Sequence, residues 1–259
     1  MRVEILGEVR VRDDAGSASA VRGKPGELLR LLAAGQGRPV GVDTIIDVLW
    51  GERPPRSVTA NLQTYASRVR AVLTRATRHG EELLRYAGGT YRLAVGADEC
   101  DLTRFADLAA HGRALRAGRE RPADPERAVR VLRAAMELWL GPPLTAAMRD
   151  RSVVAEGIAC RFEEIRLRAY ADLVGAACAA GEPESVVADL RQLVVEHPRR
   201  EGVHGLLLRA LYEAGEPADA LHAYHRLRHT LGAELGVEPG AEVRRLYEAI
   251  LRGEPVRSA

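Results

Sequence analysis

The chain of 259 residues has few aromatic side chains, only 4% of its composition, and three cysteines. With so few aromatics its cores must be built from Leu, Val and Ala, which favours helices over much of the length. Cys100, Cys160 and Cys178 are odd in number, lie far apart and form no C-x-x-C pair, which argues against a disulfide framework and against structural zinc. We expect all three to be buried small hydrophobes in a reducing cytoplasm.

Two kinds of hydrophobic segment are also missing. The N-terminus is charged from its start (MRVEILGEVRVRDD) and has no apolar core of the kind that signal peptides carry. No run reaches the ~18 apolar residues that a membrane helix needs. We therefore expect a soluble, cytoplasmic protein with no membrane partner.

Catalytic motifs are missing as well. The sequence contains no P-loop, no G-x-G-x-x-G after a strand, no H-E-x-x-H and no G-x-S-x-G. His222, His225 and His229 lie at helical spacing and in principle can share a metal. No carboxylate or Cys nearby completes a ligand set, although Asp219 is on the same helix, so surface histidines are the favoured interpretation. We predict a protein that is not an enzyme and holds no cofactor and no metal.

Charge is present, but unevenly. The formal net charge of +2 divides into +5 over residues 1–96 and −3 over residues 97–259. Residues 56–92 alone carry seven Arg against two Glu. Such segregation is typical of a nucleic-acid-binding surface, and a solvated basic face is the alternative.

The first part of the chain reads as strands followed by helices. Alternation around Gly7 predicts a strand pair within residues 1–12. An apolar run that opens at Pro25 predicts a helix ending at the Gly35–Gly37 turn. We expect Asp43 to be the N-cap of a second helix that stops at Gly51.

A third helix over residues 58–73 has two contrasting faces. Its apolar stripe predicts packing on the first two helices. The opposite face has a crest of small residues, which lets the helix approach a partner closely, and flanks of Arg and amide side chains, which read base edges or hold phosphates. The crest consists of Ala60, Thr64, Ser67 and Ala71, and the flanks of Asn61, Gln63, Arg68, Arg70 and Arg75.

After this helix, residues 83–95 alternate around Gly88-Gly89 and predict a β-hairpin with Arg85 and Arg92 near its turn. Strands, three helices and a hairpin form a helix-turn-helix core followed by a β wing. From residue 97 onward only helical patterns follow, over 101–118, 124–140, 150–181, 183–196, 199–215, 217–235 and 239–252. Asp124 and the Pro after it are typical of a helix start.

An internal repeat lies within this helical part. The tetrapeptide Ala-Gly-Glu-Pro occurs at residues 180–183 and again at 214–217, a spacing of 34 residues. This is the period of tetratricopeptide repeats, whose stacked helix pairs form concave surfaces that bind proteins. We therefore predict a mainly α fold with a small β component, with an N-terminal winged helix-turn-helix domain over 1–96 and a C-terminal all-α, tetratricopeptide-like domain over 97–259.

These motifs, taken in order, resemble the Streptomyces antibiotic regulatory protein family. In the first part the resemblance rests on LGEVRV, RPVGVDTIIDVLWGERPP, NLQTYASRVRAVL and YRL. In the second it rests on DLTRFADL, ELWLGPPL, RFEEIRLRAY and ALYEAGEPADALHAYHRLRHTLGAELGVEPGAEVRRLY. The family combines an OmpR-type winged-helix domain with a bacterial transcriptional activation domain, and the resemblance covers almost the whole chain.

The resemblance implies a sequence-specific activator of secondary-metabolite gene clusters. Such proteins bind direct repeats near the −35 element as two protomers side by side, and hold RNA polymerase holoenzyme there through its sigma factor and other subunits. The third helix then enters the major groove and the wing reaches the minor groove, with Arg85 as the nearest candidate because Ala87-Gly88-Gly89-Thr90 carries no Arg at the tip. The implied site is Asn61, Thr64, Ser67 and Arg68 on bases, Gln63 and Arg70 on phosphates, with Arg75, Arg85 and Arg92 beside them.

Two other functions stay open. A helical-repeat scaffold or adaptor with weak DNA binding is compatible with the repeat, and a ligand-gated repressor is compatible with the same fold. Segregated charge and the crest of small residues favour specific DNA reading over the scaffold, whereas activation over repression rests on the resemblance alone.

Overall fold

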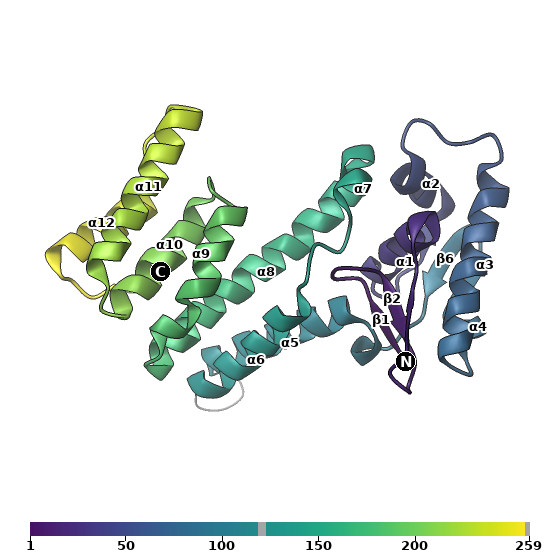
Figure 1. Ribbon diagram of the computed structural model, residues 1–259, viewed down its shortest axis with the longest axis horizontal. Coiled ribbons are helices and arrows are strands. Elements are labelled where there is room, and N and C mark those ends of the chain that lie inside the picture. The colour runs from purple at the N-terminus through teal and green to yellow at the C-terminus, as the bar shows by residue number, and fades with distance from the viewer. Residues whose placement is uncertain (119–122, 257–259) are drawn as a thin grey trace. The chain divides into compact units, whose positions relative to one another are not determined.

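The computed structural model describes residues 1–118 and 123–256, and it is mainly helical with two small sheets (Figure 1). This confirms the predicted mainly α class. Two compact units are present: unit 1 comprises Met1–Ala109 and Ala134–Arg166, and unit 2 comprises Ala110–Arg133 and Leu167–Ala259. These two units do not coincide with the predicted domains, 1–96 and 97–259. The predicted boundary after residue 96 therefore stays a prediction about function.

The first sheet of unit 1 lies at the N-terminus. It has the order β1-β2-β3 and is antiparallel, with β1 (Arg2–Glu4), β2 (Arg10–Arg12) and β3 (Ala18–Ala20). The predicted strand pair is therefore present, and β3 is an addition. The residues of β3 are small and exposed and do not alternate between apolar and polar, so its own sequence does not predict a strand. It is a strand because it pairs with β2.

Three helices follow: α1 (Gly23–Ala34), α2 (Val42–Trp50) and α3 (Val58–Ala76), then the short α4 (Gly80–Leu83). The expectation that Asp43 is the N-cap of α2 was wrong, because Gly41 occupies that position and no side chain caps the helix. Val40–Gly41 form strand β4, and the Val42 N–H donates to the Gly89 carbonyl at 3.0 Å, so the helix starts directly from a strand. Asp43 lies in the first turn, where a carboxylate is favourable near the positive end of the helix.

The second sheet has the order β4-β6-β5. Strands β5 (Leu84–Ala87) and β6 (Thr90–Leu93) form the predicted hairpin. Both turn residues, Gly88 and Gly89, have positive φ, at 54° and 72°. A two-residue turn of this kind suits glycine and matches the twist of the strands.

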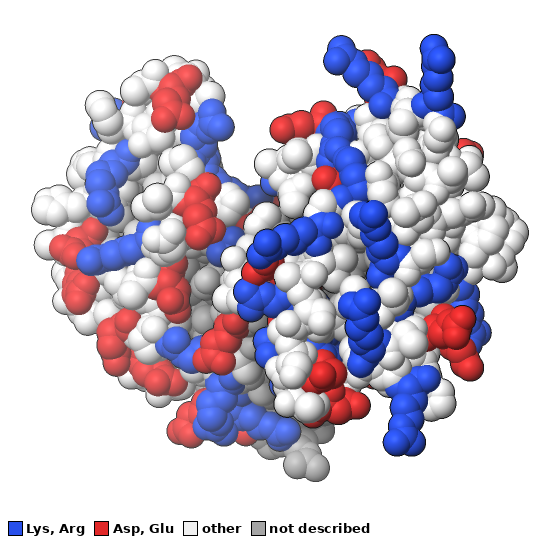
Figure 2. Space-filling view, turned by 45° about the vertical axis from the view of Figure 1, so that its right-hand side comes forward, with Lys and Arg blue, Asp and Glu red and all other residues white. Residues whose placement is uncertain are grey.

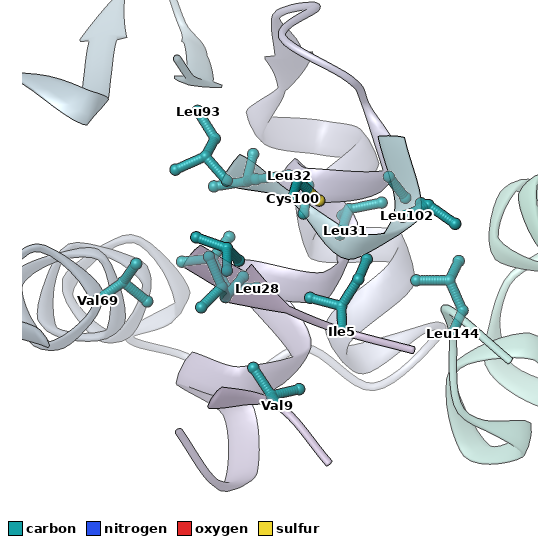
Figure 3. Close-up of a cluster of buried hydrophobic side chains, with 14 of the residues drawn as sticks. Ile5, Val9, Leu28, Leu31, Leu32, Val69, Leu93, Cys100, Leu102 and Leu144 are labelled. Atoms are coloured by element: carbon teal, nitrogen blue, oxygen red, sulfur yellow. The ribbon is translucent and has the colours of Figure 1, made fainter. Parts of the chain in front are cut away.

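The core of unit 1 joins the first 96 residues to later ones. Buried side chains of β1 and α1 pack in one cluster with Leu102 and Leu144 (Figure 3), and Phe105 and Phe162 belong to the same cluster with no exposed surface. Burying such large side chains contributes ~1.5–3 kcal/mol each. Residues beyond 96 therefore complete the core on which the three helices rest. Most of them come from α5 (Asp101–Ala117), α6 (Pro125–Leu138), α7 (Ala146–Arg151) and α8 (Val153–Ala180), whereas Leu144 lies in the segment between α6 and α7.

A buried arginine ties these parts of unit 1 together. The Arg30 guanidinium, 8% exposed, donates to the carbonyls of Ile5 (2.6 Å), Gly7, Pro142 (3.3 Å) and Pro143 (2.9 Å). Burial lowers the pKa of Arg30, and a buried cation of this kind needs a full set of acceptors.

Asp101 is the acidic counterpart of that network. Its Oδ2 accepts the N–H groups of Ile5 and Leu6, each at 2.8 Å, and its Oδ1 accepts the N–H of Leu102 at 2.7 Å. Burial raises the pKa of Asp101, and the three N–H donors act in the opposite direction. The carboxylate fixes the exit of β1 against the start of α5.

The junction between α7 and α8 is docked on the end of α2. Arg151 donates to the Leu49 carbonyl at 2.6 Å and to Glu27 Oε2 at 2.8 Å. The Ser152 hydroxyl bonds Asp47, and its Oγ accepts the Ala155 N–H at 3.2 Å. The predicted helix over 150–181 is therefore α8, and it begins only at Val153, because Ser152 adopts extended backbone and caps its start; residues 150 and 151 belong to α7.

Unit 2 consists of helices. Residues 183–196 form a 3₁₀ turn (Pro183–Val186) followed by α9 (Val187–Glu196), and then come α10 (Glu201–Glu213), α11 (Pro217–Leu235) and α12 (Ala241–Arg252). Helix α10 packs against α9, α11 and α12 (Figure 1). The predicted Asp124 cap is confirmed, since its Oδ1 accepts the Arg127 N–H at 3.0 Å.

The two repeated tetrapeptides adopt the same turn. Gly181 and Gly215 have φ of 80° and 79°. In each turn the residue after the glycine donates its backbone N–H to a carbonyl of the preceding helix. Glu182 donates to Ala177 at 2.9 Å, and Glu216 donates to Leu211 at 2.8 Å. This is the left-handed helix end that glycine favours, so the repeat in sequence is a repeat in backbone geometry.

The cysteines differ from expectation. Cys100 is buried, but Cys178 is half-buried and Cys160 is exposed on α8. The expectation of three buried thiols was thus wrong for Cys160, because a small residue on a helix surface leaves no periodic signal. No helix in the described part of the chain has the length and apolar character of a membrane span.

Candidate nucleic-acid interface

Helix α3 has the two faces that its sequence predicts. Leu62, Ala66, Val69 and Leu73 are at most 2% exposed and pack into the core of unit 1. Near the helix start, the Tyr65 ring stacks on Trp50 of α2, with centroids 6.0 Å apart. The apolar stripe therefore holds α3 firmly and turns the crest outward. All four crest residues are exposed: Ala60, Thr64, Ser67 and Ala71.

The hydroxyl of Thr64 is partly committed. Its Oγ1 donates to the Ala60 carbonyl one turn earlier, at 2.9 Å. The oxygen keeps its lone pairs, so toward a partner Thr64 presents an acceptor. Together with the methyl groups of the alanines, the crest offers contacts that a base-pair edge can use.

The flanks of the crest fall into two groups. Gln63, Arg68 and Arg75 are exposed, whereas Asn61 and Arg70 are half-buried. The Arg70 Nε–H donates to the Leu84 carbonyl at 3.0 Å, which joins α3 to β5. Arg70 thus has a structural bond, and only its terminal amino groups remain for a ligand.

The hairpin brings the other predicted arginines together. Arg85 and Arg92 lie directly opposite each other in the β5–β6 register, and both are exposed. The Arg85 Nε–H donates to the Glu82 carbonyl at 3.1 Å. Like charges directly opposite one another are unfavourable in a sheet, and an anion between them removes that cost.

Sequence reasoning missed three exposed side chains near this surface. Arg53 and Arg56 lie in the segment between α2 and α3. Tyr86 on β5 is 56% exposed and its ring lies 4.7 Å from that of Tyr91. The alternation of residues 83–95 places Tyr86 on the inner face, but the lack of a covering residue near the turn is a tertiary feature that the pattern does not carry.

Basic side chains predominate over acidic ones on the side of unit 1 that comes forward at the right of Figure 2. Acidic residues are present there, but residues 56–92 contain seven Arg and only two acidic residues, Glu81 and Glu82. A field of this sign attracts a polyanion over about a Debye length.

The histidines of α11 form no comparable site. His222, His225 and His229 are exposed, and a shallow hollow of about 430 Å³ beside them also contains the Arg228–Glu238 ion pair at 2.8 Å. Within residues 1–118 and 123–256 no group of three or more His, Cys, Asp or Glu is arranged to hold a metal ion.

Comparison with known proteins gives consistent matches. The family described as "Bacterial transcriptional activator domain" matches residues 100–251. The chain is 39% identical to the transcriptional regulator RedD of Streptomyces coelicolor, covering 99% of this chain and 72% of that protein. It is 33% identical to the regulatory protein DnrI of Streptomyces peucetius, covering 98% and 93% respectively.

A solved structure is also similar along nearly the whole chain. It is that of Mycobacterium tuberculosis EmbR in complex with a low-affinity phosphopeptide, with a TM-score of 0.80 and 34% identity. The similarity covers 99% of this chain and 66% of the EmbR chain, so this chain spans slightly less than two thirds of that relative.

Proposed function

The chain belongs to the Streptomyces antibiotic regulatory protein family of transcriptional regulators, and from this premise we propose that it is a sequence-specific DNA-binding activator. It binds direct repeats near the −35 element of its target promoters and recruits RNA polymerase, and it controls a secondary-metabolite gene cluster. Its mechanism is binding and recruitment, in the cytoplasm at the nucleoid.

The observation that carries the proposal is the exposed face of α3. Small crest residues flanked by Arg and amide side chains, on a helix fixed by a buried stripe, have the dimensions and donors for a major groove. We assign contacts with DNA bases to Asn61, Thr64, Ser67 and Arg68. We assign contacts with the phosphates of the DNA backbone to Gln63, Arg70 and Arg75. Residues 1–96 then act as the winged-helix domain.

The hairpin is the wing of that domain. Its turn carries only Ala87, two glycines and Thr90, and the Thr90 hydroxyl already bonds the Ala87 carbonyl at 2.8 Å. We therefore assign the DNA contacts of the wing to Arg85 and Arg92 behind the turn, with Arg85 nearest the minor groove.

The helical part provides the protein contacts in this proposal. The repeated turns at Gly181 and Gly215 support a tetratricopeptide-like arrangement for residues 97–259, and such repeats bind proteins. We assign to it the contact with RNA polymerase holoenzyme, including sigma factor, and the contact between two protomers side by side on DNA.

In vitro selection of binding sites from a random duplex pool, at roughly physiological salt, tests the proposal. A short motif enriched twice in the same orientation, about one helical turn apart, supports tandem binding. An inverted repeat would indicate a two-fold dimer and contradict the side-by-side arrangement. Absence of any enrichment would refute sequence-specific binding and favour the scaffold function.

A matched pair of variants then tests the assignment of α3. Arg68→Ala should weaken binding to the selected site by about 1–3 kcal/mol and relax preference at one base pair. Arg127→Ala, an exposed arginine of α6, should change neither. Equal weakening by Arg68→Ala on all sequences would make Arg68 a phosphate contact.

A further inference from the structure

The turn between α1 and β4 has an unusual backbone. Gln36 has φ of +50°, and no other non-glycine residue in the described part of the chain has a positive φ. This position directly follows the helix C-cap Gly35, where glycine or asparagine is usual because a larger side chain is strained there. Gly37 follows with φ of 75°. The fold therefore keeps a glutamine where a glycine fits better, as happens where strain serves a site.

The Gln36 side chain meets an arginine from a distant part of unit 1. Arg161 of α8 donates from its terminal amino group to Gln36 Oε1 at 3.3 Å. Its Cζ lies 4.5 Å from the centroid of the Phe162 ring, which is fully buried. Two contacts thus hold the guanidinium in place, and within residues 1–118 and 123–256 its remaining N–H groups and the Gln36 amide N–H groups make no hydrogen bond.

A second arginine belongs to the same turn as Gln36. Arg38 ends this turn, and its backbone N–H donates to the Gly35 carbonyl at 3.0 Å. Burial lowers the pKa of Arg161, and the nearby charge of Arg38 lowers it further. None of the ion pairs found among residues 1–118 and 123–256 involves Arg38 or Arg161. Two neighbouring cations without an acid form a site that an anion stabilises.

We propose that Gln36, Arg38 and Arg161 form a binding site for a phosphate group. The two guanidiniums supply charged donors and the amide supplies a neutral one, a set that suits the several oxygens of a phosphate. The phosphate comes either from the DNA backbone or from a small phosphorylated molecule. In the first case the site rests on the proposed DNA binding and extends it to α8, and in the second it is independent of DNA.

Titration of the full chain with pyrophosphate tests the site without DNA. Chemical shifts of the Gln36 side-chain amide should move on titration. Arg161→Met and Arg38→Met should each raise the dissociation constant roughly tenfold, as expected for losing a charge-assisted hydrogen bond. The control Arg127→Met should leave it within about twofold.

Gln36→Gly separates a functional role from a structural one. Glycine relieves the positive φ, so this variant should unfold at a higher temperature than the parent. It should nevertheless bind pyrophosphate more weakly, because the amide donor is gone. Unchanged pyrophosphate affinity in Gln36→Gly would remove Gln36 from the site.

The salt dependence of DNA binding identifies the source of the phosphate. If the DNA backbone fills the site, Arg161→Met should reduce the slope of log K against log salt by about one unit. If pyrophosphate binds but the slope is unchanged, a small phosphorylated molecule is the ligand. If neither pyrophosphate affinity nor slope depends on Arg161 and Arg38, the site does not exist. Failure of the parent chain to bind any DNA would refute the proposed function and leave the pyrophosphate result standing.

Discussion

Replacing Arg30 by Met tests how firmly the first helices are tied to the rest of unit 1. Methionine keeps much of the length of the aliphatic stem but donates nothing. The carbonyls of Ile5 and Pro143, which accept from Arg30 at 2.6 and 2.9 Å, are then left buried without a donor. Those of Gly7 and Pro142 lie nearer the surface and can turn to water.

The expected loss follows from these two carbonyls. A hydrogen bond to a charged donor contributes ~1.5–3 kcal/mol. Two such bonds give about 3–6 kcal/mol, and the variant recovers part of this because no guanidinium has to be desolvated. We therefore expect Arg30→Met to lower the free energy of unfolding by about 3 kcal/mol. For a chain of this size that corresponds to a melting temperature lower by roughly 6–12 °C.

Thermal and urea unfolding, followed by circular dichroism, measure this change. Arg22→Met is the matched control, since its side chain is 84% exposed just before the same helix and makes only a 3.4 Å contact with Glu8. We expect this control to stay within about 0.5 kcal/mol of the parent. A loss below about 1 kcal/mol in Arg30→Met would refute the reasoning, because the carbonyls of Ile5 and Pro143 would then be satisfied without the guanidinium.

Three further predictions concern separate parts of the chain. Arg70→Ala should reduce the salt slope of DNA binding by about one unit with little change in sequence preference; an unchanged slope would leave Arg70 with its structural bond alone. Burial lowers the pKa of His204 below 6.5, so the unfolded chain takes up the proton first, and stability should fall as pH drops from 6.5 toward the folded pKa. His204→Gln should flatten this fall in urea midpoints measured at about pH 7.5 and about pH 5.5, and an unaltered pH dependence would contradict the assignment. Asp172 is 4% exposed and accepts from Arg113 at 2.6 Å and from Arg116 at 3.0 Å. Asp172→Asn should lower the free energy of unfolding by about 2–3 kcal/mol, less than the loss of a fully buried ion pair, because both guanidiniums are partly exposed. A Tm within about 1 °C of the parent would show that this ion pair contributes nothing.

Features governed by local pattern were accessible from sequence. The two faces of α3 follow from a helical period that one segment carries by itself, and the structure places its crest residues on the surface. The Gly88-Gly89 turn and the two repeated Ala-Gly-Glu-Pro turns need positive φ, which glycine supplies. In each case the residues that determine the geometry are neighbours in the chain.

Features that depend on distant partners were not accessible. Asp43 has the chemistry of an N-cap, but the pairing of β4 with β6 sets the start of α2. Ser152 separates α7 from α8 because its hydroxyl bonds Asp47 of α2 and also accepts the N–H of Ala155 at the start of α8. The phosphate site proposed at Gln36 likewise joins residues 125 positions apart. The DNA-contact roles themselves stay predictions until binding is measured.

The order of the two compact units along the chain has a consequence for recombination. Unit 1 contains residues 1–109 and 134–166, and unit 2 contains the segments between and after them, so the backbone passes from one unit to the other three times. A single crossover between two genes of this family cannot exchange one unit whole. Chimeras joined after residue 96 will pair the α1 side of the core with foreign partners for Leu102, Phe105 and Leu144. Grafting only the exposed residues of α3, to which we assign the DNA contacts, leaves the shared core of the recipient intact.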